Sequence, residues 1–398
     1  MVWSDEATGC NIVLILLIFR GSILLPRILL IFYFNIIMNN FSIKFFVAVF
    51  AVSMSFNAIA GNKDRVGQAG APELEINPWA RSTGLFGMNT ASVDGIEALK
   101  LNIAGLANDS GFQVGVSHGI YLSGTGISIN NLAVAQKLGD AGVVGVNIMS
   151  VGFGDITATD YFNPEGYGSY HPQFLNVQLG YAKQFSTHIN AGFAATYVSE
   201  QINNISALGV AFDGGIQYVT GKKDNFHFGI VLHNIGTNMR FTGTGFAINA
   251  EQPQSTPTFA VTADYPSDKF EMPTNLNIGL AYDMYLDQNR LSGKDAVSQH
   301  RLTAYGNFTS NSFSNDYLGA GLEYSYRNMF MARAAYRYEN GIGSLSTSST
   351  MYQGLAFGVT AQTRIGGAKS PMVALDYSFR PTQRPANGVH MFAIRMTR

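Results

Sequence analysis

From Gly111 to the end of the chain, apolar residues alternate with small or polar residues in repeated segments of strand length. In one such segment Leu276, Ile278 and Leu280 alternate with small or polar residues such as Asn277. An extended strand points successive side chains to opposite faces, so each segment has one apolar face and one small or polar face. This pattern is typical of strands that meet lipid on one side and a lumen on the other.

Comparable segments begin near residues 111, 126, 141, 173, 188, 206, 225, 257, 274, 299, 316, 329, 354, 370 and 388. If one of these is not a strand, the count is about 14, and bacterial barrels have even strand numbers. Short turns such as 221–225 and long connections at 152–173, 242–256 and 287–298 separate the segments. We therefore predict an all-β fold, a transmembrane antiparallel β-barrel of about 14 strands over residues 111–398.

Composition supports the barrel over a large soluble β-sandwich, because only 13% of the 398 residues are charged while 46% are hydrophobic. Ordinary soluble domains carry roughly 25% charged residues. Many inward positions are Gly or Ala, which favours a narrow or plugged lumen over a wide, water-filled pore. Residues 61–110 are polar and Gly-rich with no sustained period, and we interpret them as an N-terminal plug or periplasmic segment.

The N-terminus contains two apolar stretches, and only the second has the organisation of a secretory signal peptide. After Met38, Lys44 supplies a positive charge, residues 45–56 are apolar, and Ala58 and Ala60 form a small-residue cleavage site before Gly61. We therefore predict a cleaved signal peptide at 38–60 and export to the outer membrane. Residues 1–37, interrupted by charges and a proline, are interpreted as an over-extended start or a leader.

The charged residues and histidines do not predict an enzyme or a nucleic-acid-binding protein. The 25 basic and 26 acidic residues nearly balance, and no basic stripe is present to bind nucleic acid. None of the seven histidines has the spacing of a known metal or nucleophile motif, and the single cysteine, Cys10, precedes the predicted cleavage site. We predict no catalytic residue, no metal and no cofactor.

Several blocks of sequence resemble the PorV/PorQ family of outer-membrane proteins. They are Arg-Ser-Thr-Gly-Leu-Phe-Gly at 81–87, Gly-Ile-Glu-Ala-Leu-Lys-Leu-Asn-Ile-Ala-Gly-Leu-Ala at 95–107, and the segments 181–185, 191–202, 209–218, 226–236 and 388–392. Family members have a proline where this chain has Ile103. The resemblance covers nearly all of the mature chain and implies a barrel like that of the FadL-type fatty-acid transporters, with an N-terminal plug.

The same resemblance implies a role in type IX secretion, in which PorV-like proteins shuttle secreted cargo by recognising its C-terminal domain. The partners implied are translocon subunits and cargo C-terminal domains, besides the lipid of the outer membrane. Two alternatives remain open: a FadL-like transporter of hydrophobic small molecules that uses the plug as a gate, and a structural scaffold of an outer-membrane complex.

Two groups of residues are candidate binding sites. The connection 152–171 carries aromatic and acidic side chains that could bind a partner or Ca²⁺, or form an interfacial aromatic girdle; the candidate partner-binding residues are Asp155, Asp160, Tyr161, Phe162, Tyr167 and Tyr170. In the plug, four apolar residues could line a ligand cavity or pack against the barrel wall; they are Trp79, Leu85, Phe86 and Met88.

Overall fold

The computed structural model describes residues 65–109, 111–251, 260–287, 298–344, 346–366, 370–383 and 386–398. Within these residues fourteen strands form one closed antiparallel barrel, each paired with its neighbours along the chain, and β1 with β18 closes the ring. The barrel strands are β1 (Phe112–Ile120), β2 (Ser128–Lys137), β3 (Val143–Gly152), β6 (Gln173–Ser186), β7 (Ile189–Ile202), β8 (Ile205–Thr220), β9 (Phe226–Gly236), β12 (Asn275–Tyr285), β13 (His300–Asn311), β14 (Tyr317–Tyr326), β15 (Phe330–Glu339), β16 (Leu355–Arg364), β17 (Met372–Arg380) and β18 (Val389–Thr397). The predicted fold class is confirmed.

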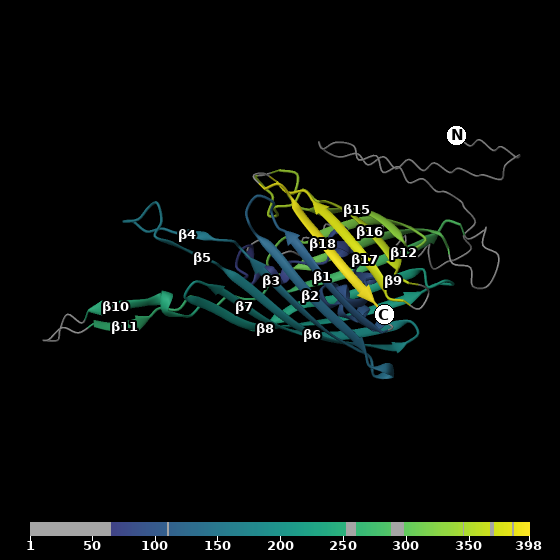
Figure 1. The fold of residues 1–398 in the computed structure, drawn as a ribbon, viewed down its shortest axis with the longest axis horizontal. Helices are drawn as coiled ribbons and strands as arrows, with labels where there is room; N and C mark the ends of the chain where they lie inside the picture. The colour runs from purple at the N-terminus through teal and green to yellow at the C-terminus, as the bar shows by residue number, and fades with distance from the viewer. Residues whose placement is uncertain are drawn as a thin grey trace, which may run out of the picture. The chain divides into compact units, whose positions relative to one another are not determined.

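The segment near residue 257 is the one predicted strand that is not part of the barrel. Around it, β10 (Ala247–Glu251) and β11 (Ala260–Asp264) pair with each other in a separate two-stranded sheet. A similar small sheet joins β4 (Ile156–Ala158) to β5 (Gly168–Tyr170). Figure 1 shows both ribbons projecting beyond the barrel at the same end, opposite the C-terminus.

The two ends of the barrel differ in their connections. One end, called here the outer end, carries the long connections 153–172 and 237–274, while the inner end carries both chain ends of the barrel and short turns such as 187–188. Long connections are extracellular and short turns periplasmic in bacterial barrels. One long connection breaks this rule: residues 286–299 join β12 to β13 at the inner end.

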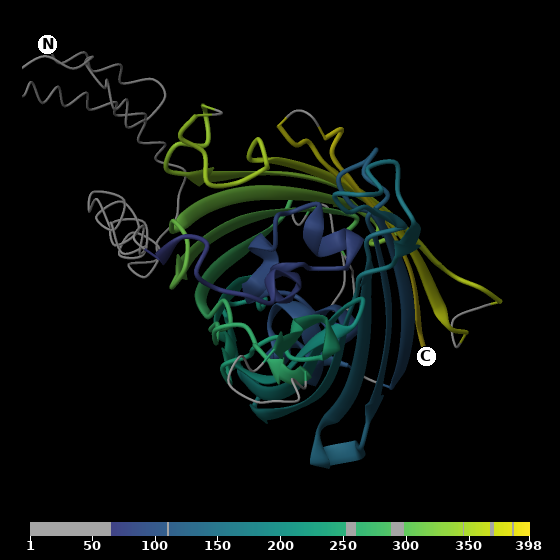
Figure 2. The same ribbon diagram turned by 90° about the vertical axis from the view of Figure 1, so that its left-hand side faces the viewer.

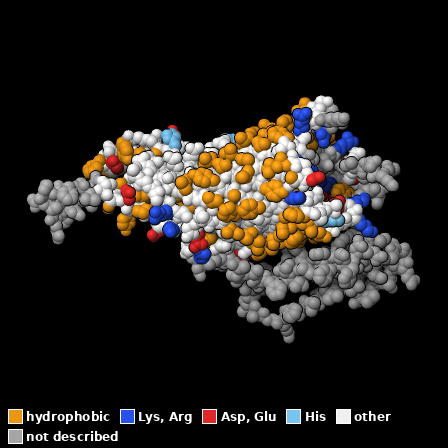
Figure 3. Space-filling view, turned by 90° about the horizontal axis from the view of Figure 1, so that it is seen from below, with side chains coloured by type: hydrophobic (Ala, Val, Ile, Leu, Met, Phe, Trp, Pro, Cys, Tyr) orange, Lys and Arg blue, Asp and Glu red, His pale blue; other side chains and the backbone are white. Residues whose placement is uncertain are grey.

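The exterior of the barrel is apolar. Figure 3 shows hydrophobic side chains gathered in a band over the strands, with charged side chains mainly towards its two ends. The lipid-facing row includes Val116, Leu132, Leu179, Phe193, Val210, Ile216, Leu322, Val359, Leu375 and Ile394, each more than a third exposed. A closed barrel with this exterior leaves no unpaired strand edge in the bilayer, and we place it in the outer membrane.

Among the described residues, no helix is long and apolar enough to cross a membrane. The predicted signal peptide, including Ala58, Ala60 and Gly61, lies outside the described residues, as do Cys10 and residues 1–37.

Most of residues 65–109 lie inside the barrel, where Figure 2 shows them within the ring of strands. The first few lie at the outer end, where Ala69 pairs with Glu271 of the connection 237–274. Residues 65–109 form only short helices: η2 (Pro72–Glu75), α2 (Ala80–Thr83), η3 (Met88–Ala91), η4 (Gly95–Glu97), α3 (Ala98–Leu101) and η5 (Ile103–Asn108), while η6 (Gly139–Ala141) and η7 (Thr244–Phe246) lie in connections between strands. The Asn102 side chain begins η5 by accepting a hydrogen bond from the Ala104 N–H at 3.2 Å. We call residues 65–109 the plug.

On one side the plug touches the wall through glycines. A Cβ on Gly192 would lie 2.9 Å from the carbonyl group of Ile103, and one on Gly229 would lie 2.7 Å from the Cα of Ala91. Gly180 on β6 and Gly215 on β8 lie equally close to plug side chains, those of Ile103 and Leu99 and that of Asn102 respectively. We call Gly180, Gly192, Gly215 and Gly229 the glycine seat. Only glycine allows so close an approach, and the space that these inward glycines leave in the lumen is occupied by the plug.

On the other side the plug is held by charged side chains. The Arg395 Nε lies 3.1 Å from Glu97 of the plug and 2.8 Å from Asp376 of β17. Arg81 of the plug lies 3.5 Å from Glu323 of β14, and Arg333 of β15 binds the same Glu323 at 2.9 Å. We call these six residues the ionic network: Arg81, Glu97, Glu323, Arg333, Asp376 and Arg395.

Candidate functional site

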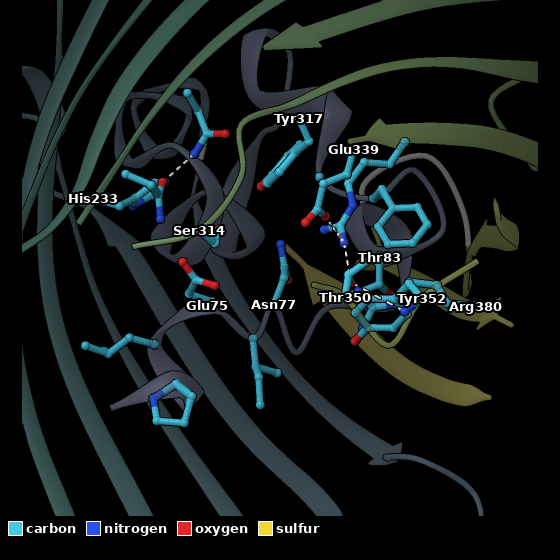
Figure 4. A pocket seen from close by; sticks show the side chains of 18 of the residues that line it. Glu75, Asn77, Thr83, His233, Ser314, Tyr317, Glu339, Thr350, Tyr352 and Arg380 are labelled. Atoms are coloured by element: carbon cyan, nitrogen blue, oxygen red, sulfur yellow. Dashed lines mark hydrogen bonds and ion pairs between the residues drawn. The ribbon is translucent and has the colours of Figure 1, made fainter. Parts of the chain in front are cut away.

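At the outer end, a cavity of about 320 Å³ lies between the plug and the wall. The plug contributes η2 and the residues that follow it, and the barrel contributes the outer ends of β9, β12, β14, β15 and β17 together with the connection before β16. Figure 4 shows Tyr352 and Arg380 on one side of this space and His233 on the other, with Glu75 and Asn77 of the plug between them. We call this space the outer cavity.

Two arginines and three aromatic rings form one side of the outer cavity. The Arg380 guanidinium lies over Tyr352 at 4.6 Å and Phe86 at 5.4 Å from the ring centroids. Arg337 lies over Tyr317 at 4.7 Å and over Phe86 at 4.9 Å. Phe86 and Tyr352 also meet edge to face at 5.4 Å. Guanidinium groups stack readily on aromatic faces, so these five side chains hold one another in place.

The opposite side of the outer cavity is more polar. His233 of β9 bonds the Leu101 carbonyl of the plug at 3.0 Å, and its second ring nitrogen lies 3.4 Å from Asp213. Lys100 donates to the Leu74 carbonyl at 2.8 Å. Burial lowers the pKa of Lys100, although the nearby carboxylates, Asp213 first among them, oppose that shift. This side therefore ties α3 of the plug to the wall and η2 to α3.

Chemistry that needs a metal is not indicated by the described residues, in which no group of three or more His, Cys, Asp or Glu side chains is placed to hold an ion. What the outer cavity offers is recognition: flat aromatic faces, guanidinium donors and amide groups in an enclosed space. Pockets of this kind orient a ligand through a few polar groups set among apolar ones.

Of the four plug residues singled out in the sequence, only Phe86 lines the outer cavity. Trp79, Leu85 and Met88 are completely or almost completely buried. Leu85 packs against Gly321 and Met88 against Gly319, both on β14. Leu85 and Met88 therefore pack against the wall, Trp79 is fully buried, and a ligand-binding role for the group stays a prediction.

The six candidate partner-binding residues belong to the connection 153–172. Tyr161 and Phe162 are 93% and 86% exposed, and their rings meet edge to face at 5.4 Å. Tyr167 is also exposed, and Tyr170 ends β5, where it pairs with Ile156. Asp160 accepts hydrogen bonds from the Phe162 and Asn163 N–H groups. Asp155 lies 2.5 Å from His171. These residues share a projecting ribbon, and their binding role remains a prediction.

Sequence reasoning did not single out Arg337, Arg380, Tyr317 or Tyr352. The alternation along β15 could have indicated Arg337, because Arg333, Arg337 and Glu339 share the inward-facing row of that strand. A charged residue in a lumen-facing row of an otherwise apolar barrel is expected to have a partner or a function. No comparable signal marks Tyr352, which lies in a connection.

No protein family and no curated protein matches this sequence. Among solved structures, the chain is similar to the Pseudomonas putida toluene transporter TodX, with 13% identity, a TM-score of 0.48, and coverage of 85% of this chain and 97% of that one. The Ralstonia pickettii toluene transporter TbuX gives 14% identity and a TM-score of 0.48 over 81% of this chain and 97% of that one. A Pseudomonas aeruginosa FadL homologue gives 10% identity and a TM-score of 0.42 over 80% of this chain and 97% of that one.

These similarities are too distant to carry a statement about function, and the fold rests on the closed strand order of this chain. None of the three structures is a PorV/PorQ protein by its description. The resemblance to that family, and the type IX partners that it implies, therefore stay predictions.

Proposed function

We propose that this protein is an outer-membrane channel that takes up small molecules with an apolar or aromatic body, and that its plug is the gate. The observation that carries the proposal is the outer cavity, which opens between the plug and the outer connections and is bordered by Phe86, Tyr317 and Tyr352. A molecule bound there lies directly against the plug, so its binding energy can favour a displaced plug conformation.

The two sides of the plug support a gate more than a permanent seal. The glycine seat holds the plug by close packing against glycines, whereas the ionic network holds it through charged side chains that can exchange partners. A passage would open more easily beside the ionic network, where most of the contacts run through side chains. The transport neighbours named above are consistent with this role without establishing it.

The test is calorimetric titration of the purified protein in detergent with toluene, using Phe86→Ala as the variant. We expect binding to the unaltered protein and roughly tenfold weaker binding to the variant, because one of the aromatic walls is removed. Phe185→Ala is the matched control, since Phe185 lies on the exterior at the inner end and is 69% exposed. Equal affinities for all three proteins, or no binding to any, would contradict the proposal.

A second candidate function is partner binding in type IX secretion, and one observation favours it. Tyr161 and Phe162 expose almost their whole rings on a ribbon that projects from the outer end. Exposed aromatic pairs of this kind are typical of protein contact surfaces. Affinity purification from native outer membranes should recover translocon subunits or cargo with unaltered protein and lose them with a Tyr161→Ser, Phe162→Ser double variant. Recovery of the same partners with both proteins would exclude this ribbon as the contact.

A further inference from the structure

The outer cavity contains a buried cation without a counter-ion. Arg380 is only 8% exposed, yet among the described residues no carboxylate and no hydrogen-bond acceptor pairs with its guanidinium. Its contacts are the ring faces of Tyr352 and Phe86. Withdrawing a charge from water without a partner is unfavourable, and proteins normally avoid it. Such a group persists where a ligand provides the missing charge.

Arg337 adds to the positive character of the same wall. One end of its guanidinium donates to Thr350 at 2.9 Å and lies 3.5 Å from Glu339, but its Nε is enclosed without a hydrogen-bond partner. The residues that line the outer cavity include three cations, Lys100, Arg337 and Arg380, against two carboxyl groups, Glu75 and Glu339. Glu339 is already engaged by Arg337, and among the described residues no ion pair joins Glu75 or Glu339 to Arg380.

The rings beside the two guanidinium groups indicate the shape of the missing ligand. Phe86, Tyr317 and Tyr352 lie beside the two guanidinium groups and line the same cavity. Ligand sites in proteins span about 300–1,000 Å³, so a cavity of about 320 Å³ suits a small, single-ring compound. An arginine fork matches a carboxylate because two parallel N–H groups can reach both oxygens.

We propose that the outer cavity binds small aromatic carboxylates, with the carboxylate on Arg380 and the ring against Phe86 and Tyr352. The inference rests on the proposed uptake function and narrows its substrates to anions. A neutral hydrocarbon would fill the same space but leave Arg380 unpaired, so the site distinguishes the two classes of compound by charge.

Calorimetric titration with sodium benzoate, and separately with toluene, at neutral pH tests the proposal on the full mature chain in detergent. We expect benzoate to bind about tenfold or more tightly than toluene, because a charge-assisted bidentate pair adds to the same ring contacts. Arg380→Gln should weaken benzoate binding about tenfold or more and weaken toluene binding clearly less, since toluene makes no charge-assisted contact with the arginine. Arg364→Gln is the matched control, since Arg364 lies at the inner end of β16 and bonds the Ser370 carbonyl.

The outcomes separate this inference from the proposed function. Toluene binding without preferential benzoate binding, or benzoate binding that Arg380→Gln leaves intact, overturns the anion site while uptake of apolar compounds stands. Absence of binding by both compounds overturns both. Far-UV circular dichroism shows whether Arg380→Gln keeps the barrel; if it does not, Arg380→Lys, which retains the charge but loses the planar fork, is titrated with benzoate instead. A benzoate affinity unchanged in Arg380→Lys then counts against the bidentate pair.

Discussion

The two sides of the barrel wall hold the plug in physically different ways. On β6 to β9 the contact is shape: Gly192 and Gly229 of the glycine seat lie against plug backbone, and Gly180 and Gly215 lie against plug side chains, with no room for a Cβ. On β14 to β18 the contact is largely charge: the ionic network links Arg81 and Glu97 of the plug to Glu323, Asp376 and Arg395. One backbone contact, between Gly84 of the plug and Gly358 of β16, adds to it. Any side chain larger than that of glycine would clash with the plug at the glycine seat. In the ionic network, removing one charged residue leaves its partner unpaired.

This difference suggests how a plugged barrel can open. Backbone contacts at the glycine seat resist movement in any direction, because small shifts produce either a clash or a void. The ion pairs can break and re-form at lower cost when water enters, since desolvation opposes their attraction in the closed state. We therefore expect the glycine seat to act as the fixed side of the plug and the ionic network as the side that moves.

The largest expected effect comes from removing the arginine at the centre of the ionic network. Arg395→Met leaves Glu97 and Asp376 buried without their shared cation, and breaking a buried pair in this way costs about 3–5 kcal/mol. Urea titration in detergent micelles should show that loss in the free energy of unfolding. Adding Glu97→Gln should restore part of it by removing one of the orphaned charges. A double variant no more stable than Arg395→Met would show that charge is not what holds this side.

The next effect tests the shape side. Gly192→Val pushes a side chain into the carbonyl group of Ile103, and overpacking of this kind costs about 1–3 kcal/mol. Thermal unfolding and protease digestion of the plug should both report the change. Gly214→Val is the matched control on the adjacent strand, because a Cβ there meets nothing within 4 Å. Equal stability of the two variants would mean that the plug moves away freely from the glycine seat.

A smaller effect concerns a neutral contact beside the ionic network. Thr83 of the plug and Ser378 of β17 share a buried hydrogen bond of 2.7 Å. Thr83→Val keeps the side-chain volume but leaves the Ser378 hydroxyl unpaired. We expect the free energy of unfolding to fall by about 1–3 kcal/mol. The lower end of this range applies if this side of the plug moves to let water reach the hydroxyl. Adding Ser378→Ala should recover stability if the unpaired hydroxyl is the cause. A further loss in the double variant would assign the effect to packing.

The barrel was predictable from the sequence because its determinant is local. Period-two alternation on each strand does not depend on distant residues, and the small inward residues correctly favoured a plugged lumen. The segment near residue 257 shows the limit: its local pattern is also that of a strand, but β10 and β11 pair with each other. Which strands join the ring is decided by pairing partners, which alternation does not encode.

The outer cavity was less predictable because it depends on ring closure. Arg337 and Arg380 lie on different strands, and Phe86 reaches them from the plug. Only the arginines stand out in their own segments, as charged residues in inward rows, and Phe86 was selected only as one of four apolar plug residues. Their convergence follows from how the plug is seated, which depends on contacts between residues far apart in the chain.

The smallest expected effect is a pH dependence confined to η2, which is held neither by the glycine seat nor by the ionic network. Glu73 of η2 is 2% exposed. Burial raises its pKa to about 8, the nearby carboxylate of Glu200 adds to this shift, and Lys100 opposes it. The protonated form is therefore the one that fits the closed plug. A raised pKa means that this stabilisation is complete below the ordinary value of 4.5 and is lost as the pH rises through about 8.

Hydrogen exchange of the backbone amides of η2, measured at about pH 6 and about pH 9 on either side of that pKa, tests this expectation. For each pH we take the ratio of the exchange rate in the unaltered protein to that in Glu73→Gln, which removes the intrinsic effect of pH on exchange. This ratio should be larger at the higher pH, because only the glutamate ionises. Amides of the glycine seat should show no such change, since Ile103 and Gly192 meet through backbone atoms alone. A ratio that stays constant between the two pH values would show that Glu73 remains in one protonation state, and that η2 is held, like the glycine seat, by shape.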